Sequence, residues 1–107
     1  MKLLTKSLET KLRANCGKEN VKPVVKFFTP DAGATWLITE LGEDGDTMFG
    51  LCDLGLGCPE LGYVSLSELK TVRGRFGLPV ERDLYFSTDK PITVWAEKAS
   101  REGRIVA

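Results

Sequence analysis

The feature that most constrains the fold is a pair of strand-like segments separated by a short turn. Residues 34–41 (ATWLITEL) and 47–54 (TMFGLCDL) are rich in apolar, β-branched and aromatic side chains, a composition typical of strands. The intervening GEDGD contains Asp44-Gly45, a dipeptide that favours a tight hairpin turn. We therefore predict an antiparallel hairpin. Strict alternation along the first strand places Trp36, Ile38 and Glu40 on one face and Leu37, Thr39 and Leu41 on the other.

Three further segments have the composition of strands. Residues 24–29 (VVKFFT) precede the hairpin and are separated from it by a turn at 30–33 (PDAG). Residues 61–64 follow the hairpin, and residues 84–86 (LYF) form the last strand-like run. The sequence therefore predicts four or five strands.

Helical patterns occur at the N-terminus and in the middle of the chain. Leu4, Leu8 and Leu12 recur every four residues among charged side chains, which predicts an amphipathic helix of about three turns. Ser65 and Glu68 have the spacing of a capping box at the start of a second helix. Gly74 stands where a left-handed C-terminal cap would end this helix near Arg73.

A closing helix is expected after Pro91, with a cap from Thr88 or Asp89. Its apolar face consists of Ile92, Trp95, Ala96 and Ala99, and it is expected to end before Gly103. We predict an α+β fold over residues 1–107, with a single core spanning about 3–99 and a loose tail at 100–107. The antiparallel sheet of four or five strands should carry two or three helices, mainly on one face.

Composition excludes several kinds of chemistry. The chain has no histidine and three cysteines, Cys16, Cys52 and Cys58. Histidine bases, histidine metal ligands and an all-cysteine zinc site in one chain are therefore excluded. We expect Cys52 and Cys58 to behave as small buried apolar residues. No apolar run is long enough to cross a bilayer, so we expect a cytoplasmic protein without a membrane partner.

The net charge is zero, but its distribution along the chain is uneven. Residues 1–26 carry seven basic and two acidic side chains, residues 27–66 carry seven acidic and no basic ones, and residues 67–107 carry eight basic and six acidic ones. Such asymmetry can mark a partner surface. The simpler interpretation, which we favour, is that the basic N-terminal segment folds back on the acidic middle.

Residues 73–77 (RGRFG) combine two arginines with a phenylalanine, as nucleic-acid-binding segments do. A helix cap and a turn with two solvated arginines would produce the same letters, and for so short a motif this simpler interpretation is favoured.

Carboxylates suggest two further sets of candidate residues. Pro30-Asp31 with Glu68-Leu69-Lys70 has the letters of a metal-dependent nuclease, although Glu68 is expected to act in the helix cap. Glu40, Glu60, Glu81 and Asp83 lie at predicted strand ends or loops and could converge on magnesium or manganese. The adjacent Glu81-Arg82-Asp83 can also form a local ion-pair cluster.

Residues 60–86 (ELGYVSLSELKTVRGRFGLPVERDLYF), with VKFFTPD at 25–31, Trp36, Thr39-Glu40 and Phe49-Gly50, resemble the bacterial family called domain of unknown function 2958. The resemblance covers roughly residues 1–87. It implies a small protein encoded on plasmids, phages and integrative elements. Some members carry the label of a single-stranded DNA endonuclease, but the family supplies no established functional residues.

Three functions follow as hypotheses. The first is a non-enzymatic accessory protein of a mobile element that binds a protein or a nucleic acid and needs no cofactor. The second is a single-stranded DNA endonuclease using magnesium or manganese, and the third is an inhibitor whose acidic residues 27–66 mimic DNA. The oligomeric state is left open. The candidate binding residues are Glu40, Glu60, Arg73, Arg75, Glu81, Arg82 and Asp83.

Overall fold

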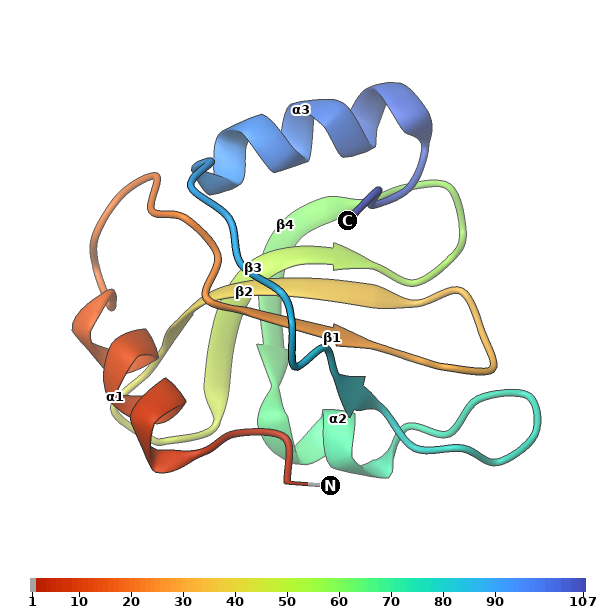
Figure 1. Cartoon of the computed structure of the whole chain (residues 1–107), viewed down its shortest axis with the longest axis horizontal. Helices are drawn as coiled ribbons and strands as arrows, with labels where there is room; N and C mark the ends of the chain where they lie inside the picture. The colour runs from red at the N-terminus through yellow and green to blue at the C-terminus, as the bar shows by residue number, and fades with distance from the viewer. Residues whose placement is uncertain (1) are drawn as a thin grey trace.

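A five-stranded antiparallel sheet forms the centre of the fold (Figure 1). The computed structural model describes residues 2–107 and gives the strand order β4-β3-β2-β1-β5. The strands are β1 (Val25–Phe28), β2 (Thr35–Leu41), β3 (Thr47–Asp53), β4 (Glu60–Ser65) and β5 (Glu81–Arg82). The predicted hairpin is β2–β3, and Gly45 in its turn has a φ of 70°. The α+β prediction is confirmed.

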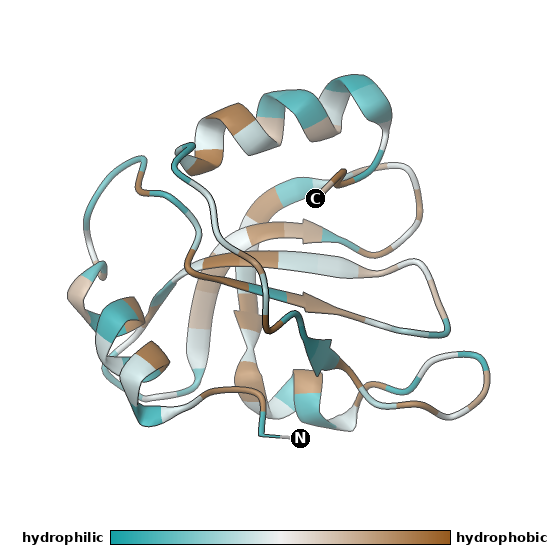
Figure 2. Ribbon diagram, in the orientation of Figure 1, coloured by the Kyte–Doolittle hydropathy of each residue, from teal (hydrophilic) through white to brown (hydrophobic). Residues whose placement is uncertain are grey.

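Three helices cover the two faces of the sheet (Figure 1). One face packs on α1 (Lys6–Ala14) and α2 (Leu66–Thr71), and the other packs on α3 (Ile92–Glu102). Figure 2 shows hydrophobic residues along the central strands. The larger core includes Trp36, Ile38, Leu12 and Leu69, whereas the smaller core includes Leu37, Leu51, Ile92 and Ala99. None of the helices within residues 2–107 is long and apolar enough to span a membrane.

A β-bulge in β2 changes the predicted faces of that strand. Ile38 pairs with Gly50 and Glu40 pairs with Phe49, so Thr39 is the extra residue. Its hydroxyl donates to Phe49 O at 3.1 Å. Because one extra residue reverses the alternation beyond it, Glu40 joins the α3 face and Leu41 enters the larger core. The prediction that Glu40 shares a face with Trp36 is wrong.

Helices α1 and α2 are each capped at the N-terminus by the hydroxyl side chain of the residue before the helix. Thr5 Oγ1 accepts a hydrogen bond from Leu8 N, and Ser65 Oγ accepts one from Glu68 N as predicted. The end of α2 differs from the prediction. Val72 is already extended and Gly74 has no positive φ, so Gly74 is not a left-handed cap.

Asp44 and Asp46 stabilise the hairpin turn and the start of α2. The Thr47 hydroxyl and the amides of Asp46 and Thr47 lower the pKa of Asp44 from 3.8 to about 2. The hydroxyl of Ser65 and the amide of Ser67 lower the pKa of Asp46. Both carboxylates thus accept hydrogen bonds from backbone amides and hydroxyls that would otherwise bond to water.

Acid should weaken the fold through these two carboxylates. Because the folded pKa of each lies below the unfolded value of 3.8, their stabilisation is present above that pH and is lost as the pH falls through the folded pKa, which for Asp44 is about 2. We expect the melting temperature to fall more steeply over that interval in the wild type than in Asp44→Asn, as measured by circular dichroism. Parallel profiles for the two proteins would contradict this assignment.

The C-terminal part of the chain corrects two predictions. The strand predicted at 84–86 is wrong, because β5 ends at Arg82 and Asp83 Oδ1 accepts from Tyr85 N in a turn. The loose tail predicted at 100–107 is also wrong. Helix α3 ends at Glu102, before Gly103 as predicted, but Ile105 beyond it is buried in the smaller core with its amide donating to Asp53 Oδ2 at 2.9 Å.

The start of α3 is capped by a distant side chain instead of by Thr88 or Asp89. Asn20 Oδ1 accepts from Thr93 N at 3.3 Å and from Thr93 Oγ1 at 2.7 Å. The predicted apolar face of α3 is confirmed, since Ile92, Trp95, Ala96 and Ala99 contact the smaller core.

Of the two cysteines expected to be buried, Cys52 is partly buried, which raises its pKa to about 11, whereas Cys58 is exposed.

Candidate nucleic-acid interface

The residues 73–79, which we call the basic loop, form a small hairpin after α2. Arg73 and Pro79 make an antiparallel bridge, and Gly74 N donates to Leu78 O at 2.9 Å. Gly77 N donates to Gly74 O, and Gly77 has a φ of 82°, a conformation that glycine adopts readily. The RGRFG motif is therefore a closed turn in its own right, separate from the helix cap.

Asp31 fixes this loop from the β1–β2 connection. Its Oδ2 accepts from Phe76 N at 2.6 Å and from Leu78 N at 3.3 Å. Its Oδ1 is buried against Gly74, where an added Cβ would lie 1.5 Å away. Adjacent amides in a turn are a natural site for an anion. The carboxylate is thus an internal anion that holds the loop in one shape.

The fixed loop presents an exposed aromatic ring next in sequence to an exposed arginine. Phe76 is 79% exposed at its tip, and Arg75 beside it is exposed as well. Arg73 Nη1 donates to the carbonyls of Lys70 and Val72 at 3.0 and 2.8 Å, which holds this guanidinium over the end of α2. An exposed ring combined with nearby basic residues is a feature of proteins that bind single-stranded nucleic acids.

The Glu81-Arg82-Asp83 run is not a local ion-pair cluster. Arg82 Nη1 donates to the carbonyls of Lys2 and Leu3 at 2.9 and 2.7 Å, and so ties the N-terminal segment to β5. Asp83 lies 3.6 Å from Lys26 Nζ. Glu81 pairs with Phe28 in the sheet. Arg82 and Asp83 therefore have structural partners within the fold.

The acidic residues predicted to converge are separated. Glu40 lies on the α3 face, whereas Glu60 pairs with Cys52, which packs on the larger core on the opposite face. Within residues 2–107, no three acidic or thiol side chains are grouped so that they could hold a metal ion. Asp31 is engaged with the basic loop and Glu68 is exposed on α2. Glu40, Glu60, Glu81 and Asp83 are therefore not assembled into a metal site within these residues.

Most acidic side chains of residues 27–66 accept hydrogen bonds from other groups of the chain. Backbone amides donate to the carboxylates of Asp31, Asp44, Asp46, Asp53 and Glu40. The basic N-terminal segment does lie against this region, because Arg13 Nη1 donates to Glu43 O at 3.4 Å and Gly17 N donates to Glu40 Oε2. These internal partners argue against a surface that mimics DNA.

Sequence reasoning identified Arg73 and Arg75 but missed the role of Asp31. The sequence contains an aspartate in a Pro-Asp turn and a glycine in RGRFG, but these residues are more than forty positions apart, so no local pattern links them. Only the fold brings the carboxylate to the loop amides.

No curated protein and no solved structure shows significant similarity to the chain. One family does match, and it is described as "Protein of unknown function (DUF2958)". The match covers residues 3–106 and so extends the resemblance at residues 1–87 through α3 and the buried Ile105. The chain therefore belongs to the DUF2958 family.

Proposed function

We propose that the protein binds single-stranded nucleic acid through the basic loop and does so without catalysis. The observation that carries this proposal is the exposed ring of Phe76 on a backbone that Asp31 holds in place. Residues 66–80 contribute three basic side chains, Lys70, Arg73 and Arg75, against the single acidic Glu68.

The expected energetics support this assignment. Stacking of one base on an aromatic side chain contributes about 1–3 kcal/mol. A loop already fixed in its bound shape loses less conformational entropy on binding than a mobile one. The arginines add contacts to phosphate that are independent of sequence. A modest, salt-dependent affinity with little sequence preference follows.

The family resemblance adds a biological setting to the proposal. An accessory protein of a plasmid, phage or integrative element would meet single strands during replication or transfer of that element. A protein partner is the second candidate ligand class, and the absence of binding to single strands would direct the search toward it.

The test of this proposal concerns Phe76. Fluorescence anisotropy with a labelled oligothymidine should show binding at low salt, and Phe76→Ala should weaken it by roughly tenfold because a stacked base loses its ring. Phe76→Tyr is the matched control and should bind like the wild type. A fourfold rise in salt should weaken binding about tenfold to twentyfold if three cations contact phosphate.

Two results would overturn the proposal. One is the absence of binding to single strands at low salt, and the other is equal binding by Phe76→Ala. The same strands incubated with manganese should remain intact. Metal-dependent cleavage that is lost in Asp83→Asn would instead establish the endonuclease hypothesis.

A further inference from the structure

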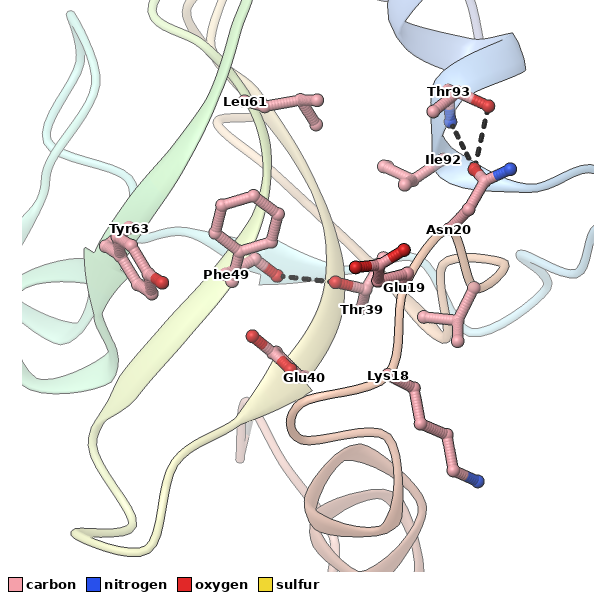
Figure 3. A pocket seen from close by; sticks show the side chains of 11 residues that line it. Lys18, Glu19, Asn20, Thr39, Glu40, Phe49, Leu61, Tyr63, Ile92 and Thr93 are labelled. Carbon is pink, nitrogen blue, oxygen red and sulfur yellow. Dashed lines mark hydrogen bonds between the residues drawn. The ribbon is translucent and has the colours of Figure 1, made fainter.

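A second surface lies on the α3 face, at the end of the sheet that α3 leaves uncovered (Figures 1 and 3). A cleft of about 260 Å³ opens there between the sheet, the connection after α1 and the first turn of α3. We call it the Glu40 cleft. Its lining includes Lys18, Glu19, Thr39, Glu40, Phe49 and Tyr63.

The β-bulge delivers Glu40 to this cleft. Without the extra residue Thr39, alternation would direct Glu40 toward the larger core. Gly17 N donates to Glu40 Oε2 at 2.9 Å, which fixes the carboxylate. Glu40 Oε1 takes no part in this hydrogen bond. The Asn20–Thr93 hydrogen bonds hold the opposite wall against α3. The cleft is therefore built by specific contacts at both walls.

Two aromatic rings form the wall beside Glu40. Phe49 and Tyr63 are a cross-strand pair with ring centroids 5.0 Å apart and an interplanar angle of 64°. Tyr63 is 73% exposed although it lies in a strand. Aromatic faces attract cations, and a neighbouring carboxylate adds a direct ionic partner.

We propose that the Glu40 cleft binds the guanidinium group of an arginine side chain carried by a partner protein. The charges on its lining are complementary to that ligand, since Glu19 and Glu40 outnumber Lys18. Figure 3 shows Lys18 extending away from the rings, so the chain does not fill the cleft with its own cation. A planar guanidinium can stack on Tyr63 and donate two hydrogen bonds to one carboxylate, which an ammonium cannot do.

The test uses capped Gly-Gly-Arg-Gly-Gly and the same peptide with citrulline, a neutral isostere of arginine. Amide shifts are followed by ¹H–¹⁵N NMR at millimolar peptide. The arginine peptide should shift residues 39–40, 49 and 61–63, whereas the citrulline peptide should leave them in place. Because these residues lie outside the basic loop, failure here would leave the proposed function untouched.

Matched variants assign the interaction to its groups. Glu40→Gln keeps an oxygen for Gly17 N but removes the charge, and it should weaken binding about tenfold. Tyr63→Ala should weaken binding about threefold, and Tyr63→Phe should retain it because the ring face is preserved. Glu68→Gln, on exposed α2, should bind normally. Unchanged binding in Glu40→Gln, or equal shifts with citrulline, would overturn the proposal, provided that melting temperatures confirm folded variants.

Discussion

Replacing Gly50 with alanine is expected to prevent folding, with a loss of about 4 kcal/mol or more in the free energy of unfolding. A Cβ at Gly50 would lie 2.0 Å from Leu37 O and 2.8 Å from Ile38 Cα. Both atoms belong to the backbone of β2 in the middle of the sheet, so neither can turn aside. The close approach lies next to the bulge, because Gly50 pairs with Ile38, the residue immediately before Thr39.

Gly62 supplies a matched control for this prediction. It pairs with Gly50 across β3 and β4, yet an added Cβ there meets no atom within 4 Å. Gly62→Ala should therefore change the unfolding free energy by less than about 1 kcal/mol. Urea unfolding followed by circular dichroism compares the two. A folded Gly50→Ala protein with the stability of Gly62→Ala would show that the strands can separate at the bulge without cost.

Gly74→Ala should lower the free energy of unfolding by about 2–3 kcal/mol and impair binding of single strands as well. The new methyl group would occupy the position of Asp31 Oδ1. The carboxylate would then have to leave the amides of Phe76 and Leu78, and the basic loop would lose its support. Urea unfolding and oligothymidine anisotropy measure the two effects on the same samples.

A double-mutant cycle isolates the cause. Asp31→Ala removes the clashing carboxylate, so Gly74→Ala in that background should cost less than about 1 kcal/mol. Asp31→Ala alone should be destabilising because two loop amides lose a charged acceptor. If the two single effects simply add, the loop and the carboxylate are not coupled as the structure indicates.

Local sequence patterns predicted much of this fold because the interactions behind them join residues that are close together in the sequence. Asp44-Gly45 fixed the hairpin turn, Ser65 capped the helix that follows it, and the spacing of Ile92 and Ala99 identified the buried face of α3. The bulge at Thr39 could not be predicted, since it depends on a backbone contact with another strand.

Long-range contacts account for the remaining differences. The cap of α3 comes from Asn20 and the buried Ile105 is held by Asp53, pairings that no local pattern contains. The candidate site divides in the same way. Arg73 and Arg75 could be chosen from their motif, whereas Arg82 and Asp83 proved to contact the chain's own backbone or Lys26.

A ¹H–¹⁵N NMR titration of the full chain with oligothymidine tests the central claim most directly. We predict progressive shifts concentrated at residues 70–78, with the largest change at the amide of the exposed Phe76 or its neighbours. The Glu40 cleft should be unaffected. An unchanged spectrum at low salt, or shifts confined to surfaces outside residues 70–78, would contradict the assignment of the basic loop as a nucleic-acid interface.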